Sequence, residues 1–415
     1  MFIKRLFDFA DQYFLRHPLP HGIVCWRYLL PHPATKVHIH RRLWILSRPA
    51  RIPLVLFFFI EALLWLRWVL FAGWRATFRA VWYRREAIRK QEDLSIVSQT
   101  MQILPLSLGY CIPPVDIYAF GLYKIKSKHD IWNYIFSQEQ LAFHSWRNAK
   151  LNNNGESVSL LQDKQKTSTL LAARGIPMAP ILEVVSRGAA FDMTSCFQSH
   201  SRLFCKPCHG SRSQDAFVIE TNSELSQVSI FAVKNGMRAQ PATQKQLRKA
   251  MMRDDFLIQP FLINHPSFAA LTSSGDVITM RVITENTPCS GIICYSATIE
   301  MPCDSGAAEY RHIVLPIDQD SGMLNHFPER LLPEQTQSLY NEIYNRMDGF
   351  IIPFWETINK SVLEAHQYFP DIYAIAWDCV VTPEGPYLLE GNSGWGARTP
   401  QMIFGGLLGN MNSKD

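Results

Sequence analysis

Apolar and polar positions in the second half of the chain predict strands and helices in alternation. Apolar runs of strand length occupy residues 181–185, 202–206, 216–220, 256–259, 277–284 and 292–300. Helical patterns cover residues 164–173, where Gly175 and Pro177 end the helix, then residues near 243–252 and from about 333 to 367. This order of elements predicts an α+β body.

Three oxygen-bearing side chains belong to a predicted hairpin near the C-terminal end. An apolar run over residues 375–381 is separated from a second over 387–389 by a Pro-Glu-Gly-Pro turn. Side chains alternate along a strand, so Glu390 and Asn392 face the same way and Asp378 lies across from them. Asp378 also interrupts an apolar strand, where an unpaired charge costs several kcal/mol. Because Mg²⁺ prefers oxygen ligands, the hairpin predicts a magnesium site.

A long apolar segment lies in the N-terminal part of the chain. Residues 53–71 have the length of a membrane span but contain Glu61 and Arg67. Arginines flank the segment on both sides, and its tryptophans suit the headgroup level of a bilayer. These flanks favour a helix that lies in the membrane interface. A true span and a helix buried against the main domain remain alternatives.

The charge of the chain is distributed unevenly. Residues 1–90 hold 16 Lys and Arg against 4 Asp and Glu, whereas the whole chain of 415 residues has 41 and 36. With 47% hydrophobic and 12% aromatic residues the chain is folded. Long apolar runs within the basic region favour anionic lipid over nucleic acid as its partner. The first residues lack a signal-peptide pattern, so we expect the catalytic part in the cytoplasm, peripheral on the inner face of the membrane.

Nine cysteines without regular spacing predict reduced thiols and no disulfide framework. One segment, Cys205-Lys206-Pro207-Cys208-His209, matches the attachment string of haem c and half of a zinc site. Haem attachment needs an exported chain, and zinc needs a second pair of ligands, which the sequence does not supply. The segment therefore favours another use.

That use is phosphate binding. Lys206 ends a predicted strand, and the polar loop that follows contains Gly210 and Ser211, whose backbone N–H groups can fold over phosphate oxygens. Arg281 lies in a β-branched strand, as a donor fork for a transferring phosphoryl group. The glycine-bearing loop after Asn392 leads to Arg398, which we expect to bind an anionic substrate. The alternative for each of these residues is an ordinary solvated position.

A family resemblance joins these observations. It rests on Asp163-Lys164, Gly175-Ile176-Pro177, Lys206 with its loop, Gln259-Pro260-Phe261-Leu262, Arg281, Asp378 and Glu390-Gly391-Asn392. Taken in order, over residues 160–408, these motifs resemble an ATP-grasp domain, and most closely its sugar-transfer associated branch. The resemblance implies an ATP-grasp fold of two α+β lobes that enclose ATP, here preceded by a basic, amphipathic and mainly helical N-terminal region.

The resemblance also implies roles for individual residues. Lys164 and Lys206 contact the α- and β-phosphates of ATP, Gln259, Pro260, Phe261 and Leu262 line the adenine, Arg281 meets the γ-phosphate, and Asp378, Glu390 and Asn392 hold Mg²⁺. The implied activity is that of a carboxylate-amine ligase. It activates a carboxylate as an acyl phosphate for attack by an amine or similar nucleophile, with a sugar-linked acceptor and a place in cell-surface polysaccharide biosynthesis suggested by the name of the branch.

Two alternatives keep the same ATP residues. A kinase on this scaffold would leave a stable phosphorylated product. A membrane-tethered nucleotide-binding scaffold without catalysis is favoured by the single glycine in the loop after Lys206. The expected domains are a membrane-associating helical region over 1–95, a mixed segment over 96–160, an N-terminal lobe with phosphate loop and hinge over 161–262, and a C-terminal lobe with the magnesium site over 263–415.

Overall fold

The computed structural model describes residues 25–29, 35–125, 129–151, 155–192, 196–209, 215–221, 228–234, 237–271, 277–287, 289–302, 312–328 and 334–409. The chain divides into two compact units. The first unit comprises Met1–Lys150, Pro328–Gln337 and Gly396–Asp415, and the second comprises Leu151–Phe327 and Ser338–Trp395. Each unit is described separately below.

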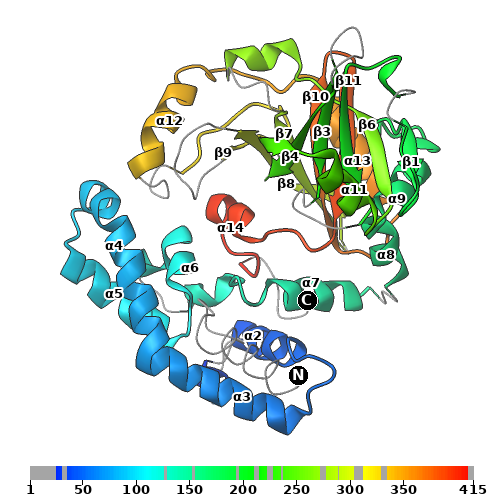
Figure 1. The fold of residues 1–415 in the computed structure, drawn as a ribbon. Helices are drawn as coiled ribbons and strands as arrows, with labels where there is room; N and C mark the ends of the chain where they lie inside the picture. The colour runs from blue at the N-terminus through cyan, green and yellow to red at the C-terminus, as the bar shows by residue number, and fades with distance from the viewer. Residues whose placement is uncertain are drawn as a thin grey trace. The chain divides into compact units, whose positions relative to one another are not determined.

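The first unit is helical in its described part (Figure 1). Its elements are η2 (Trp26–Leu29), α2 (Thr35–Leu46), α3 (Leu54–Arg67), the π-helical turn η3 (Trp68–Ala72), α4 (Gly73–Glu92), α5 (Ile96–Gly109), α6 (Pro114–Ala119), η4 (Leu122–Lys124), η5 (Asp130–Asn133), α7 (Gln140–Ala149) and α14 (Arg398–Phe404). A buried aromatic cluster that includes Tyr28, Trp44 and Trp132 packs these helices together. Inside it, the ring of His40 lies 2.6 Å from Glu139, and both side chains are fully buried.

The second unit contains two antiparallel sheets (Figure 1). One has the strand order β1-β6-β2-β3-β4-β5 and the other β11-β10-β7-β8-β9. The strands are β1 (Glu183–Val185), β2 (Arg202–Pro207), β3 (Phe217–Thr221), β4 (Val228–Lys234), β5 (Met237–Ala242), β6 (Phe256–Pro260), β7 (Thr279–Thr287), β8 (Gly291–Pro302), β9 (His312–Pro316), β10 (Ala374–Thr382) and β11 (Gly385–Asn392). The helices are α8 (Glu156–Gln162), α9 (Lys164–Ala172), α11 (Gln244–Met251), the short η6 (Pro266–Ala270) and α13 (Trp355–His366), while α12 (Glu334–Tyr344) includes residues of both units.

Trp377 is the centre of the core on one face of the five-stranded sheet. Its ring is fully buried, and its indole N–H donates to the hydroxyl of Thr284 at 3.0 Å. The same hydroxyl lies 2.7 Å from Nδ1 of His366, whose Nε2 is 2.9 Å from the carbonyl of Ile372. A neutral imidazole satisfies both contacts, because Nε2–H donates to the carbonyl while Nδ1 accepts. Helix α13, which carries His366, therefore joins the sheet through a fully satisfied polar network as well as by apolar packing.

The predicted α+β class and the helical N-terminal region are confirmed. The helix predicted over residues 164–173 forms α9, and Gly175 follows it with a positive φ of 80°. The helical region predicted over residues 333–367 forms two helices, α12 and α13, which the positive-φ residues Gly349 and Phe354 separate.

Gly391 gives a test of core packing. A Cβ at this position would lie 2.7 Å from the ring of Trp377 and 2.8 Å from Leu161. We expect Gly391→Ala to lower the free energy of unfolding by about 1–3 kcal/mol, because the buried indole has no free space to move into. Chemical denaturation measures this, with Gly394→Ala as the control, since a Cβ there meets nothing within 4 Å. Equal stability of the two variants would contradict the packing described here.

His366 gives a test of pH dependence. Burial lowers the pKa of His366 below its ordinary value of 6.5. The unfolded chain therefore takes up a proton at this residue before the folded chain does, and stability falls as pH drops below about 6.5, by at most about 1.4 kcal/mol per pH unit. In denaturant titrations at neutral and acid pH, the stability difference between wild type and His366→Gln should narrow as pH falls. A difference that is constant or widens would contradict this assignment.

Candidate active site

A row of charged side chains crosses three neighbouring strands of the five-stranded sheet. Asp378 on β10 pairs in register with Glu390 on β11 and with Arg281 on β7. Residues directly opposite each other in antiparallel strands project from the same face of a sheet. The register thus brings together three of the residues predicted from the sequence, on the face opposite Trp377, which is the neighbour of Asp378 along β10.

Arg281 forms the central ion pair of this row. Its guanidinium donates to both oxygens of Asp378, at 2.9 and 3.2 Å, and lies 3.3 Å from Glu300 on β8. The Asp378 carboxylate raises the pKa of Arg281, so the guanidinium stays charged. Burial raises the pKa of Asp378 in spite of this ion pair. The bidentate geometry fixes the orientation of both side chains.

Glu390 faces two lysines. Its carboxylate lies 3.6 Å from the ammonium of Lys164 and accepts a hydrogen bond of 3.3 Å from the Asn392 amide. Burial alone would raise the pKa of Glu390, but Lys206 and Lys164 outweigh burial and lower it. Burial lowers the pKa of Lys206, which Glu390 and Asp378 partly offset. Glu390 is therefore a carboxylate held ionised by neighbouring cations.

The start of α9 places Lys164 next to Lys206. Asp163 caps the helix by accepting from the backbone N–H of Lys166 at 3.0 Å. The N–H of Lys164 bonds to the carbonyl of Cys208, just beyond the end of β2, at 3.3 Å. Since Lys206 lies on β2 itself, these backbone contacts bring the two lysines to the same end of the six-stranded sheet.

The charges of this cluster balance. Three carboxylates (Asp378, Glu390 and Glu300) meet three cations (Arg281, Lys164 and Lys206). Glu300 was not among the site residues predicted from the sequence. A signal for it exists, because Glu300 is the one charged residue of β8, just as Asp378 is the one charged residue of β10. A polyphosphate added to a balanced cluster brings excess negative charge, and cations that accompany it would offset this charge.

The donor set fits a hard cation. The candidate ligands are Asp378, Glu390 and Asn392, two carboxylates and an amide oxygen, with Ala376 as the partner of Asn392 across the hairpin. Among the described residues, no group of three or more His, Cys, Asp and Glu could hold a metal, so the third protein ligand would be the amide. Both oxygens of Asp378 accept from Arg281, but a carboxylate offers about four lone-pair positions, which leaves room for a cation. One or two carboxylates are the usual protein share of a Mg²⁺ site that also binds phosphates.

The predicted adenine strand lies at the end of β6. The side chain of Gln259 donates to the carbonyls of Ala179 and Pro180 at 3.3 and 3.2 Å, so it holds the segment before β1 in place. The ring of Phe261 lies 3.9 Å from the guanidinium carbon of Arg202. Pro260 ends the strand, and Leu262 follows it half-buried.

The predicted phosphate loop is only partly described. Gly210 and Ser211 lie outside the described residues. At the start of the loop, Asp254 accepts from the backbone N–H of His209 at 2.9 Å and contacts its ring at 3.0 Å. The thiols of Cys205 and Cys208 are buried and free, and burial raises the pKa of Cys208 to about 12.

Arg398 belongs to the first unit, whereas the other described site residues belong to the second. Its guanidinium bonds to Asp116 at 3.0 and 3.1 Å and donates to the hydroxyl of Ser137 at 2.8 Å. Asp116 is fully buried, so it needs this cation. No local pattern predicts this pairing, because the two residues are 282 positions apart.

Comparison with known proteins identifies the family. Residues 145–414 match the family model described as sugar-transfer associated ATP-grasp, and the chain belongs to this family. The resemblance inferred from the sequence motifs is therefore confirmed. No curated protein matches the chain.

Solved structures of ligases resemble the chain distantly. They include D-alanine–D-alanine ligase from Bacillus anthracis, with 13% identity, a TM-score of 0.35 and coverage of 60% of this chain and 62% of that chain. D-alanyl-alanine synthetase A from Vibrio cholerae has 12% identity, a TM-score of 0.39 and coverage of 62% and 63%. N5-carboxyaminoimidazole synthetase from Staphylococcus aureus has 10% identity and a TM-score of 0.33, with coverage of 57% of this chain and 46% of that chain. The chain covers less than two thirds of each, and these likenesses are too distant to assign an activity.

The ion pair at the centre of the row can be tested by a double-mutant cycle. Arg281→Met leaves Asp378 and Glu300 without their cation, and we expect it to lower the free energy of unfolding by about 2 kcal/mol. In the background of Asp378→Asn the same change should cost less, with a coupling energy of about 1 kcal/mol or more, because only Glu300 is then left unpaired. Denaturant unfolding of the four proteins measures this coupling. Additive effects would contradict a shared ion pair.

Proposed function

We propose that the protein is an ATP-dependent ligase that activates a carboxylate as an acyl phosphate, which an amine or similar nucleophile then attacks. Membership of the ATP-grasp family supports this proposal. The observation that carries it is the half-buried cluster in which Arg281, Lys164 and Lys206 meet the carboxylates of Asp378 and Glu390. Such a cluster is arranged to neutralise a polyphosphate and to position it.

Each residue has a distinct part in the proposed reaction. The ammonium groups of Lys164 and Lys206 bind phosphate oxygens, and the guanidinium fork of Arg281 offsets charge on the transferring phosphoryl group. The carboxylate oxygen forms a bond to the γ-phosphorus as ADP leaves, and the amine nitrogen then displaces phosphate from the carbonyl carbon and loses a proton. Asp378, Glu390 and Asn392 would hold Mg²⁺, which when bound neutralises phosphate charge.

The acceptor and the location belong to the same proposal. The family description associates this branch with sugar transfer, which supports a sugar-linked acceptor in cell-surface polysaccharide biosynthesis. The reaction needs ATP, so we place it in the cytoplasm. Arg398 remains the proposed contact for an anionic substrate, although it also neutralises Asp116.

The reaction class can be tested with purified protein, Mg-ATP and a panel of amino acids and sugar acids, with hydroxylamine present. We expect ADP release that depends on one acid, together with the hydroxamate of that acid, because hydroxylamine intercepts an acyl phosphate. A stable phosphorylated product that hydroxylamine does not consume would indicate a kinase. ATP binding without turnover on every acid would instead support a nucleotide-binding scaffold.

The proposed metal ligands give a sharper test. Asp378→Asn and Glu390→Gln should each abolish turnover, a loss of at least about 100-fold, because charge neutralisation on the phosphates is lost. Both variants keep the shape of the side chain, so circular dichroism should show a folded protein. Glu364→Gln is the matched control, since Glu364 is an exposed carboxylate paired with Lys360 on α13. Unchanged ATP use in either site variant would remove the proposed site.

A further inference from the structure

One continuous helix dominates the first unit. Elements α3, η3 and α4 together run from Leu54 to Glu92, 39 residues that include a strongly apolar window of which only 22% is buried within the protein. At 1.5 Å per residue such a helix is about 58 Å long. This is roughly twice the 30 Å hydrocarbon core of a bilayer. Length and composition alone would thus allow part of this helix to span a membrane or to lie on one.

One side of the helix packs on its own unit. Phe57, Glu61, Leu64 and Trp68 are buried on this side at helical spacing. Glu61 is 1% exposed and accepts from the indole N–H of Trp44 on α2 at 3.4 Å. A helix that spanned a bilayer as a separate segment would have to leave these partners and take Glu61 into lipid, which is costly. The packed side therefore favours a helix that stays on its unit.

The π-helical turn keeps the same side packed along the whole helix. Trp68 and Gly73 are five residues apart across this turn, and both are buried. The indole N–H of Trp68 donates to the carbonyl of Ser107 on α5 at 2.9 Å. A Cβ at Gly73 would lie 2.6 Å from the side chain of Leu108 and 2.7 Å from the carbonyl oxygen of Trp68, so the backbone of the turn leaves no room for a larger residue here. The opposite side of the helix consequently stays exposed in both halves.

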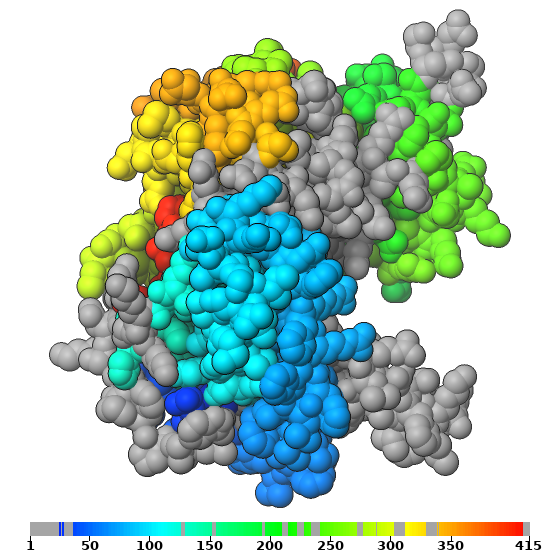
Figure 2. Space-filling view, turned by 90° about the vertical axis from the view of Figure 1, so that its left-hand side faces the viewer, coloured from blue at the N-terminus to red at the C-terminus, as the bar shows by residue number. Residues whose placement is uncertain are grey.

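That opposite side is apolar. Large hydrophobic side chains recur along it at steps of mostly three or four residues: Val55, Phe59, Leu63, Leu66, Leu70, Phe71, Trp74, Phe78 and Trp82, each at least 40% exposed. Figure 2 shows the blue and cyan atoms of α3, α4 and α5 as a continuous surface that faces the viewer. We call the side of α3, η3 and α4 that carries these nine exposed side chains the apolar face.

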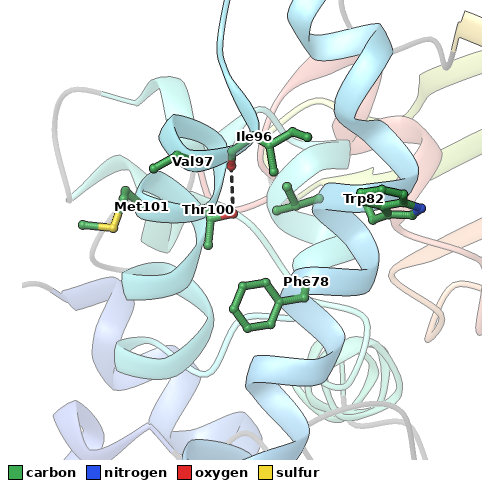
Figure 3. A pocket seen from close by; sticks show the side chains of 7 residues that line it. Phe78, Trp82, Ile96, Val97, Thr100 and Met101 are labelled. Carbon is green, nitrogen blue, oxygen red and sulfur yellow. Dashed lines mark hydrogen bonds between the residues drawn. The ribbon is translucent and has the colours of Figure 1, made fainter.

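A groove of about 480 Å³ extends the apolar face between α4 and α5. Figure 3 shows its lining, which is Phe78, Val81, Trp82, Ile96, Val97, Thr100 and Met101. The one hydroxyl among them, on Thr100, donates to the carbonyl of Ile96 at 2.8 Å. Apart from the indole N–H of Trp82, the groove thus offers a ligand mainly apolar contact, which suits an acyl chain.

Basic side chains accompany the apolar face. Helix α4 has six basic residues against two acidic ones. Arg75, Arg79 and Arg89 are exposed, and the guanidinium of Arg85 lies 4.1 Å from the ring of Trp82. Exposed Trp and Leu beside Arg is the composition of helices that lie at the surface of anionic membranes. A second copy of the chain placed on this face would bring like charges together, which disfavours a symmetric dimer.

We propose that the apolar face of α3, η3 and α4, with the groove against α5, binds the surface of a bilayer that contains anionic phospholipid. The helix lies in the plane of the membrane, its apolar side chains enter the acyl region, and its arginines contact phosphate headgroups. An acyl chain occupies the groove. This inference is independent of the ligase reaction, because it rests on residues of the first unit alone and its failure would leave the proposed function unchanged.

Binding of the full-length protein to vesicles tests the proposal. We expect the protein to sediment with vesicles of phosphatidylcholine mixed with phosphatidylglycerol and to bind vesicles of phosphatidylcholine alone at least about tenfold more weakly. Added salt should weaken binding to the anionic vesicles, because it screens the arginines. Alkaline carbonate should release the bound protein. Equal binding to both kinds of vesicle, no binding to either, or retention after carbonate would overturn an in-plane, charge-assisted contact.

Two methionines of similar exposure give a matched pair of variants. Met101 on the groove is 68% exposed, and Met252 at the end of α11 in the second unit is 64% exposed. Met101→Glu should weaken binding to anionic vesicles at least about tenfold, since it removes an apolar contact and adds a repelled charge. Met252→Glu should leave binding unchanged, and both variants should unfold at the wild-type denaturant midpoint.

Two results with these variants would overturn the proposal. Equal vesicle binding by Met101→Glu and Met252→Glu would show that the groove does not contact lipid. Sedimentation equilibrium without vesicles supplies the second readout. A wild-type dimer that Met101→Glu dissociates would assign the apolar face to a second copy of the chain.

Discussion

The arrangement of the second unit depends on the compensation of charge inside its five-stranded sheet. Arg281, Asp378 and Glu390 occupy one register row across β7, β10 and β11, and each carboxylate faces a cation. Carboxylates and cations in a half-buried position are costly when unpaired, so a change in register at this row would leave charges without partners. The same row holds the chemistry attributed to the ATP-grasp site. Both the stability of the unit and the proposed activity thus require the same order and register of β7, β10 and β11.

The six-stranded sheet contributes residues to the charged cluster from one end of its strands. Lys206 comes from β2, and the backbone bond between Lys164 and Cys208 ties the start of α9 to the same place. The segment before β1 bonds in turn to β11 through Leu388. Two sheets with separate hydrogen-bond networks are therefore joined close to the charged cluster. A nucleotide bound there would contact groups whose positions both sheets determine.

Local pattern predicted the parts of this protein that depend on short-range rules. The hairpin of β10 and β11 follows from two apolar runs around a Pro-Glu-Gly-Pro turn, and the helix at Lys164 from its helical pattern and a Gly stop. Two contacts between distant parts of the chain were not predicted. Glu300 joins the cluster only because β8 pairs with β7, and Arg398 meets Asp116 across 282 positions. The helical pattern over residues 333–367 does not show where α12 ends and α13 begins, because Phe354 adopts a left-handed conformation that its residue type does not indicate.

The π-helical turn at residues 68–72 has a further consequence. An α-helix advances by about 100° per residue, so the one extra residue in this turn sets the rotational phase of α4 relative to α3. A regular α-helix over the same residues, without this turn, would rotate the arginine-bearing half by about that angle against α5. Side chains such as Thr77 would then turn outward, and Phe78 or Trp82 would turn toward the interior. The π-helical geometry of this turn therefore determines which side chains of α4 are exposed.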